Sequence, residues 1–380
     1  MANPEQYKTR LESLCAVYTA LRQAPLLTRR ELCSALSLSW GGISELCAAL
    51  LRCGAITEQK EPPSSARGRT PGVLAVSERA RFLGIDINQM GISLCLTDGY
   101  GNEIRREKPE APITAPRELT ERACRAAKAL LSDLPLPPLG IGVAMQGART
   151  GSGTFCVSFG GETQTLDPAG ALRAACGIPV TVHHDPDCML YSLPSDKTQE
   201  GLLMVRLDRG VGLAVCRKGN ILTDGMYELG KTVFPENGNL IGLEEIVREA
   251  GGYAAAETPA CVSAGGAQPD PAGTSFTRAG TALGVALGNL AQLIPVTEIA
   301  LCGDLVRDAD RFVPVIARTL QKILGGAAPR LSVHRLTDAA LGAARFACVE
   351  FPKYLHKAEE NPLAKILFSS ESEAYDGGCA

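Results

Sequence analysis

Long apolar runs are missing from this 380-residue sequence: no stretch reaches the roughly 18 consecutive apolar residues that a membrane-spanning helix needs. The first residues, MANPEQYKTRLE, also lack the apolar segment of a secretory signal. We therefore expect a cytoplasmic protein that does not bind a membrane. Wholesale disorder is excluded as well, because 45% of the residues are hydrophobic and 21% are charged. This length and composition favour two or three domains with a buried core.

Paired cysteines are also missing. The 14 cysteines are scattered from Cys15 to Cys379, and no two have the CxxC spacing of metal or redox motifs. Several lie in apolar runs, where free cysteine packs as a small hydrophobic residue; these are Cys33, Cys47, Cys95 and Cys216. We therefore expect reduced core thiols and no disulfide framework.

Aspartate is absent from residues 1–81, which hold 11 Lys and Arg against 7 Glu and so carry a net charge of +4. The rest of the chain holds 27 basic residues against 34 acidic ones and carries −7. A basic front end on an acidic body is compatible with a nucleic-acid-binding head, although the difference alone is a weak signal.

The pattern of residues 1–78 predicts a helix, a short helix, a third helix and two strands. Residues 5–23 place their apolar side chains at helical spacing. Thr28-Arg29-Arg30-Glu31 predicts a capping box at the start of the second helix. Ser39 is a natural N-cap for the third helix, and Gly54 closes it. Strands are expected at 55–58 and 72–76, joined by a loop rich in Pro, Ser and Arg. This order is typical of a winged helix-turn-helix.

A winged helix contacts DNA with the first residues of its third helix and with its wing. The predicted DNA-contacting residues are Thr28, Ser39, Trp40, Gly41, Ser44, Arg67 and Arg69. The two arginines lie in the wing loop and would face phosphates or a narrow minor groove. The third helix offers few hydrogen-bond donors to DNA. Gly41 and Gly42 each lower the stability of this helix by about 1 kcal/mol relative to Ala. Glu45 would repel phosphate, although it can accept a hydrogen bond from cytosine. A helical protein–protein module is the alternative.

The body, from residue 82 to about 350, alternates strands and helices, which predicts an α/β class with two lobes. Lys218-Gly219-Asn220 predicts a turn after the second strand of the latter half. Helices are expected at 117–132, 277–294 and 310–324. Strands are expected at 82–87, 92–98, 139–144, 180–184, 202–207, 212–217 and 298–302.

Several motifs in this body resemble the ROK family (repressors, open reading frames, sugar kinases) in order and spacing. They are the strand–Asp–turn–strand start at Asp86, GIGVAMQG, HHDPD, LDRGVG and YELGK. The resemblance covers residues 10–350, and the winged helix in front is similar to the repressor branch. It implies an actin/hexokinase-like pair of lobes around a cleft, where kinase members bind ATP and a sugar and repressors usually bind a sugar effector. The expected domains are 1–78 (winged helix), 79–190 (N-terminal lobe), 191–352 (C-terminal lobe) and 353–380, a tail poorly ordered beyond about 358.

The resemblance also implies where three phosphate-binding turns would lie, and this sequence departs from all three. Asp86 is followed by Ile-Asn-Gln-Met-Gly instead of Gly-Gly-Thr-Lys, Asp208-Arg209-Gly210 replaces Gly-Thr-Gly, and Asp304 follows a single glycine. A carboxylate 4 Å from a phosphate oxygen costs about 4 kcal/mol even at an effective dielectric near 20. We therefore expect no kinase activity, no catalytic residue and no cofactor.

Four residues match the sugar pocket that the resemblance implies. Asp185 occupies the position of the family's catalytic base. Asp185 and Glu228 both match acids that bind the sugar in the family. Lys231 replaces a histidine and would favour an acidic or phosphorylated ligand, and Ser158 stands near an asparagine of the family. These are the predicted effector-binding residues. Asp185 could instead simply cap the following helix, and a pocket without any ligand stays open.

A metal site is not expected. The family's zinc motif is a cysteine cluster, and the matching stretch from 228 to 244 has no cysteine. Lys231, at the position of a histidine ligand, is protonated and binds zinc poorly. His183-His184-Asp185 could indicate a metal centre, but neighbouring residues on a strand point to opposite faces.

Together these features predict a DNA-binding transcriptional regulator, with repression as the expected output. It would bind a double-stranded operator as a homodimer or dimer of dimers, and a ligand in the cleft would change the distance between two heads. The alternatives are a ROK-type sugar kinase with altered nucleotide use and a ligand-independent DNA-binding protein.

Overall fold

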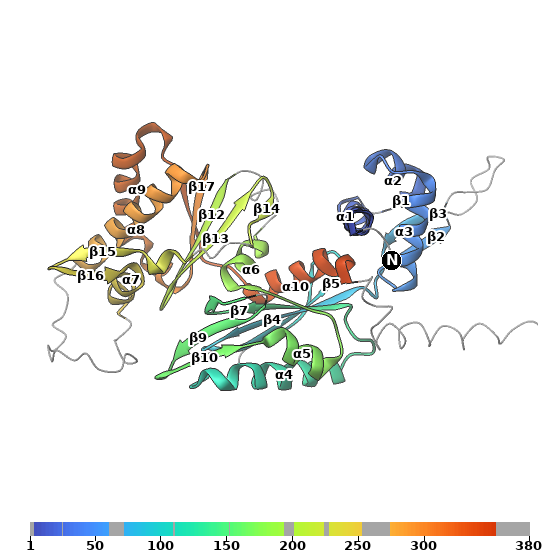
Figure 1. The fold of residues 1–380 in the computed structure, drawn as a ribbon, viewed down its shortest axis with the longest axis horizontal. Coiled ribbons are helices and arrows are strands. Elements are labelled where there is room, and N and C mark those ends of the chain that lie inside the picture. The colour runs from blue at the N-terminus through green and yellow to red at the C-terminus, as the bar shows by residue number, and fades with distance from the viewer. Residues whose placement is uncertain are drawn as a thin grey trace, which may run out of the picture.

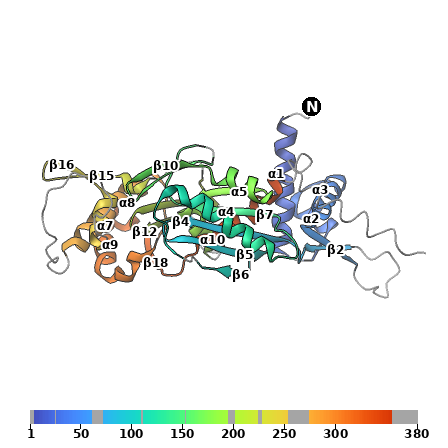
Figure 2. The ribbon, with the colours of Figure 1, turned by 90° about the horizontal axis from the view of Figure 1, so that it is seen from below.

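The structure, a computed structural model, describes residues 4–24, 26–60, 72–108, 111–151, 153–193, 201–223, 228–252 and 274–354. A small N-terminal head, a middle lobe and a C-terminal lobe follow one another in Figure 1, and the view from below in Figure 2 shows the same order. The predicted fold class is confirmed: two α/β lobes follow an α+β head.

The head has the predicted order of a winged helix. Its helices are α1 (Pro4–Gln23), α2 (Arg29–Leu36) and α3 (Trp40–Arg52), and its sheet has the order β1-β3-β2, with β1 (Leu27–Thr28), β2 (Ile56–Lys60) and β3 (Gly72–Val76). Thr28 and Glu31 form the predicted capping box, and the Gly42 amide donates to the Ser39 hydroxyl oxygen at 3.2 Å. Gly54 has a φ of +69° after α3, so both ends of this helix follow local sequence signals.

The middle lobe is built on a five-stranded sheet with the order β11-β7-β4-β5-β6. Its strands are β4 (Arg81–Asn88), β5 (Gly91–Asp98), β6 (Glu103–Glu107), β7 (Gly140–Met145) and β11 (Val180–His184). Helices α4 (Pro116–Ser132) and α5 (Pro168–Cys176) cover one face, and α6 (Asp185–Ser192) and α10 (Ala339–Glu350) lie on the other (Figure 1). A small sheet of β8 (Ala148–Arg149), β9 (Phe155–Phe159) and β10 (Glu162–Leu166) adjoins them.

Two glycines explain why α10 lies so close to the middle sheet. A Cβ at Gly84 or Gly142 would overlap the backbone of α10, at Ala340 and Ala343 respectively. The chain therefore returns from its C-terminal part to complete the middle lobe. The expected 191–352 unit is corrected in this respect, because α10 packs on β4 and β7.

The C-terminal lobe repeats the strand topology of the middle lobe. Its sheet order is β14-β13-β12-β17-β18, with β12 antiparallel to β13 and parallel to β17. This duplication is what an actin/hexokinase-like pair of lobes requires. The strands are β12 (Leu202–Leu207), β13 (Val211–Arg217), β14 (Asn220–Ile221), β17 (Glu298–Cys302) and β18 (Arg330–His334).

Helices and a hairpin complete this lobe. The α-helices are α7 (Leu243–Ala250), α8 (Thr274–Leu293) and α9 (Ala309–Leu324). Three short 3-10 helices lie between the elements of this lobe, namely η2 (Leu229–Lys231), η3 (Asp304–Asp308) and η4 (Gly325–Ala327), and η5 (Phe351–Tyr354) follows α10. The hairpin consists of β15 (Val233–Glu236) and β16 (Asn239–Gly242). Lys218 and Gly219 form the predicted turn before β14 and both have positive φ.

The predicted body elements lie close to their predicted ranges. The elements that were not predicted are α5, α7, α10, β8, β9, β10, β14, β18 and the β15–β16 hairpin. Most of the expected tail lies outside the described residues. The twelve cysteines within the described ranges are free; Cys47, Cys95 and Cys216 are buried, while Cys33 is partly exposed. No single helix in those ranges is long and apolar enough to cross a membrane, and only the bent pair of α2 and α3 would qualify jointly by length and composition.

Candidate functional site

The first turn of α3 presents an open surface in the described part of the head. Trp40, the single tryptophan of the chain, has 61% of its surface exposed. Gly41 is exposed, and a Cβ placed on it would meet no atom within 4 Å. Ser44, one turn further, is half-buried. An exposed indole beside a bare backbone allows a close approach by a partner surface.

Two side chains near the predicted DNA surface, Thr28 and Glu45, are bonded to other residues of the head. The Thr28 hydroxyl donates to Glu31 Oε2 at 2.8 Å and accepts from the Glu31 amide at 3.2 Å, so its bonding capacity is largely used within the capping box. Glu45, expected to repel phosphate, pairs with Arg10 at 2.8 Å, which offsets its charge. The predicted wing arginines Arg67 and Arg69 lie outside the described residues.

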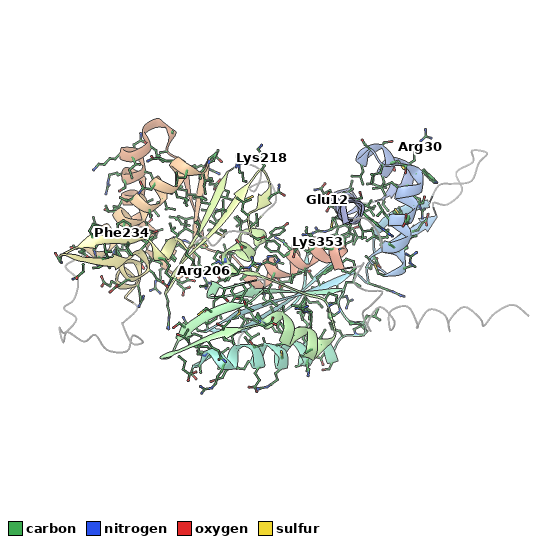
Figure 3. The ribbon with its side chains drawn as sticks, in the orientation of Figure 1. Glu12, Arg30, Arg206, Lys218, Phe234 and Lys353 are labelled. Carbon is green, nitrogen blue, oxygen red and sulfur yellow. The ribbon has the colours of Figure 1, made fainter. Side chains whose placement is uncertain are left out.

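Arg206 lies at the junction of the middle and C-terminal lobes, where Figure 3 labels it. Its guanidinium pairs with Asp185 at the start of α6 and with Asp208, two residues beyond it in the chain. Asp185 is buried, with 4% of its surface exposed. The N-cap of α6 is His184, whose Nε2 lies 3.4 Å from Asp185 Oδ1. Asp185 is thus held by an ion pair between the lobes.

Burial perturbs the titration of the groups around Arg206. It raises the pKa of Asp86 to about 6, although the charge of Arg206 and a hydrogen bond from Asn88 oppose the rise. One oxygen of Asp86, Oδ1, is buried without a hydrogen-bond partner. Burial lowers the pKa of His184 to about 4, and the nearby positive charges of Arg206 and Arg149 lower it further. His184 is therefore neutral at pH 7.

A second buried acid lies in the same turn of α6. Asp187 has 5% of its surface exposed, and burial raises its pKa to about 7, against the opposing charge of Arg149. Arg149 belongs to β8 of the middle lobe and donates to the Thr223 carbonyl of the C-terminal lobe at 2.6 Å. Arg149 therefore bridges the two lobes beside this carboxyl group.

Backbone amides at two of the three expected phosphate turns, the first and the third, are already bonded to side chains of the protein. In the first turn, the Met90 amide donates to Asn88 Oδ1 at 2.8 Å and the Gln89 amide donates to Gln146 Oε1 at 3.0 Å. The turns at Asp208 and Asp304 meet each other, because Asp208 Oδ1 accepts from the Asp304 amide. A carboxylate thus takes the place that a phosphate oxygen would need.

The other predicted effector residues fall into two places. Lys231, in η2, pairs with Glu244 of α7 at 3.2 Å, and both charges act on Glu228, whose pKa is raised from its usual value mainly by burial. A Cβ at Gly210 would approach Glu244 Oε1 at 2.6 Å, so the 208–210 turn adjoins this cluster. Ser158 instead bonds Thr163 at 2.8 Å across the exposed β9–β10 hairpin of the middle lobe.

Sequence reasoning missed Arg206 and Glu244, which neutralise Asp185 and Lys231 respectively. A signal was present for Arg206: it is the charged residue in the otherwise apolar strand LLMVRL. Glu244 gave no comparable signal, because it lies among several acids in the first turn of an amphipathic helix. Its partner could be recognised only once η2 and α7 had been placed.

The two neighbouring histidines have different surroundings, as strand geometry predicts. His183 stacks on Phe346 with ring centroids 3.9 Å apart and its Nε2 lies 2.9 Å from Glu350 Oε2, whereas His184 approaches Asp185. Among the described residues, no group of three or more His, Cys, Asp or Glu side chains is arranged to hold a metal ion.

A groove of about 710 Å³ lies elsewhere, in the C-terminal lobe. It separates the β15–β16 hairpin from α8, and none of the predicted effector residues lines it. Phe234, labelled in Figure 3, and Ile246 form part of its apolar wall, while Arg278 pairs with Glu236 and Glu249.

No protein-family model and no curated protein matches the sequence. Solved structures do match. A ROK family transcriptional regulator, a homologue of the E. coli Mlc protein, aligns with a TM-score of 0.73 over 95% of this chain and 99% of its own, at 16% identity. A ROK hexokinase from Thermus thermophilus aligns at 0.53 over 70% of this chain and 97% of its own, at 20% identity.

A ROK family glucokinase from Streptomyces griseus, solved with glucose and AMPPNP, gives 0.53 over 70% of this chain and 99% of its own, at 15% identity. The chain therefore has the fold of these ROK proteins, and the match to the regulator covers 95% of the chain, so it extends over the head as well as the body. The resemblance indicated by the sequence motifs is confirmed at the level of the fold.

Proposed function

We propose that this protein is a DNA-binding transcriptional regulator of the ROK type that represses by binding a double-stranded operator as a homodimer or dimer of dimers in the cytoplasm. The observation that carries the proposal is the likeness to a ROK regulator over 95% of the chain, whereas the kinases align with 70% of it. The additional segment includes a head in which α3 follows α2 as in helix-turn-helix proteins. We propose 1–78 as this DNA-binding unit, with lobes at 79–190 and 191–352 except for α10.

The head has the charge and surface for this role. Residues 1–81 carry +4, and non-specific attraction to phosphates grows with such charge. Trp40 and Gly41 give α3 an apolar, flat first turn, which suits contact with thymine methyl groups rather than hydrogen-bonded base reading. The wing arginines Arg67 and Arg69 would then supply phosphate contacts, as proposed from the sequence.

The cleft supports a role without phosphoryl transfer. A kinase needs amides that are free to bind phosphate oxygens and a base that can accept the proton of the sugar hydroxyl. Here the Met90, Gln89 and Asp304 amides are bonded to side chains, and Asp185 is paired with Arg206. A guanidinium lowers the basicity of the carboxylate that it pairs with.

A sugar remains the proposed class of effector, since Asp185 and Glu228 are acceptors for sugar hydroxyls. The expectation of an acidic or phosphorylated ligand is not supported by the charges. Lys231 is balanced by Glu244, and Glu228 adds a second acid beside it. A neutral sugar would meet less repulsion there than its phosphate. A ligand-independent DNA-binding protein is the second candidate, favoured by the ion pairs of Arg206, which already occupy Asp185 and Asp208.

The test uses Trp40 as an internal probe. DNA that flanks the protein's own gene should change the emission of this single tryptophan and retard the protein in a mobility-shift assay. Arg67→Ala with Arg69→Ala should weaken binding and reduce the slope of log affinity against log salt by about two. The matched control, Arg125→Ala with Lys128→Ala on α4, should leave both unchanged.

Three outcomes separate the candidate functions. ADP release in a coupled assay with a panel of sugars would establish the kinase and refute the proposal. DNA binding that a neutral sugar weakens supports the proposed regulator. DNA binding that no sugar changes indicates the ligand-independent protein.

A further inference from the structure

The turn from Asp98 to Asn102, which joins β5 to β6, is held rigidly by its own side chains. Asp98 Oδ1 accepts from the amides of Tyr100 at 2.9 Å and Asn102 at 2.8 Å, and Asp98 Oδ2 accepts from the Asn102 side chain at 3.0 Å. The carbonyl groups of Gly99, Tyr100 and Gly101 remain available to other parts of the molecule. This turn therefore presents a fixed row of backbone acceptors.

The DNA-binding head uses two of these acceptors. Arg22, in the last turn of α1, donates through Nε to the Gly99 carbonyl at 2.9 Å and through Nη2 to the Tyr100 carbonyl at 3.1 Å. The planar guanidinium makes two bonds of fixed direction, which set the rotation of α1 as well as its distance from the turn.

The third acceptor is used by Arg345 of α10. Its Nε donates to the Gly101 carbonyl at 3.1 Å, and its Nη1 donates to the carbonyls of Tyr191 and Ser192 at 3.2 and 2.8 Å. Tyr191 and Ser192 end α6, the helix that begins at Asp185. One side chain thus joins the turn to the helix that carries the effector acid.

These bonds specify position more than they add stability. No carboxylate in the described ranges lies within ion-pair distance of Arg345, and burial together with the charge of Arg22 lowers the pKa of Arg345. Two like charges at one turn repel, so the separate carbonyl acceptors of that turn must hold each guanidinium in place. Apolar contacts complete the joint: Tyr18 of α1 packs edge-on against Phe351 at 6.1 Å, beside the end of α10. Figure 1 shows α10 pointing toward the head.

We propose that Arg345 is a positioning residue for the DNA-binding head: through the Asp98–Asn102 turn it fixes the orientation of α1 and ties that orientation to α6. The proposal rests on the proposed function, because only a DNA-binding head needs a set orientation relative to its partner head. A shift at the start of α6 would then reach the head through a continuous set of hydrogen bonds.

The first experiment needs no DNA. Time-resolved fluorescence anisotropy of Trp40 reports the motion of α3, and in the wild-type chain its slow decay should follow the tumbling of the whole particle. Arg345→Met and, separately, Arg22→Met should each add a faster nanosecond decay as the head loosens. Arg106→Met is the matched control, because Arg106 pairs with Glu103 and with Asp338 at the other end of α10 and does not touch the turn.

A second measurement separates positioning from general stability. Affinities are measured for the operator and for variants in which the spacing of the half-sites is changed by single base pairs. The wild-type chain should bind the original spacing more tightly than the changed ones. In Arg345→Met and Arg22→Met the ratio of these affinities should fall toward one. Unchanged anisotropy in both variants, or an equal change in Arg106→Met, overturns the proposal. If the wild-type chain binds no DNA, the proposed function is refuted instead. The anisotropy measurement then still tests whether Arg345 and Arg22 hold the head rigidly against the body, because it needs no DNA.

Discussion

Replacing Asp187 with asparagine tests how strongly the junction of the lobes disfavours a charge. The carboxyl group is 5% exposed and accepts no hydrogen bond from the described residues, and burial raises its pKa from 3.8 to about 7. At about 1.4 kcal/mol for each pKa unit, this rise corresponds to roughly 4 kcal/mol of folding free energy. Asparagine has nearly the same shape and polarity but carries no charge at any pH.

The direction in which pH changes the stability difference between Asp187→Asn and the wild type follows from the protonation of Asp187 in the folded and unfolded chains. Well below pH 3.8 the carboxyl group is protonated in both the folded and the unfolded chain, and the variant gains nothing from removing it. Between pH 4 and 7 the unfolded chain releases its proton more readily, so the wild-type protein loses stability that Asp187→Asn retains. The difference in free energy of unfolding should therefore grow by about 4 kcal/mol and level off above pH 7.

Urea unfolding followed by circular dichroism at pH 4, 5, 6, 7 and 8 measures this difference. His184, whose pKa is lowered to about 4, titrates in both proteins and cancels when they are subtracted. The control is Asp310→Asn, an exposed acid in the first turn of α9, which should stay within about 0.5 kcal/mol of wild type at every pH. A flat difference for Asp187→Asn would refute the inference that its charge is buried.

Three further substitutions test the packing and the site. Arg206→Met should lower the free energy of unfolding at pH 7 by about 3–5 kcal/mol in the same assay, because buried Asp185 and half-buried Asp208 lose their partner; a loss below 1 kcal/mol would contradict the ion pairs. Gly41→Ala should stabilise the chain by up to about 1 kcal/mol, since the new methyl meets nothing, yet weaken operator binding in a mobility shift; tighter binding would exclude contact there. Gly84→Ala should cost about 3 kcal/mol by overlapping Ala340, whereas Gly326→Ala, in open space, should change little; equal melting temperatures would refute the close approach of α10.

Local signals in the sequence predicted most of the head and much of the body. Thr28 and Glu31 are three residues apart, and each side chain accepts a hydrogen bond from the other's backbone amide, so this capping box depends on local sequence alone. Ser39 and Gly54 likewise mark the two ends of α3. Apolar strands such as Leu202–Leu207 and Glu298–Cys302 were found at their observed bounds. The motifs around Asp86 and Asp185 indicated the ROK fold because their order, and not any one of them, was specific.

The sequence could not reveal partners far apart in the chain. The apolar, alanine-rich stretch of α10 fits any buried helix, and only Gly84 and Gly142, more than 190 residues earlier, decide that it lies on the middle sheet. Lys231 seemed to offer a free positive charge until folding brought Glu244 beside it.

The amino-acid order by itself thus determined which segments are helices and strands and which turns had lost the glycines of a nucleotide site. Tertiary structure alone decided what those turns do instead. Asp208 reaches the amide of Asp304 because β12 pairs with β17 in one sheet, and Arg206 reaches Asp185 across the junction of the two lobes. An electrostatic contact depends on distance in space, which separation along the chain does not fix.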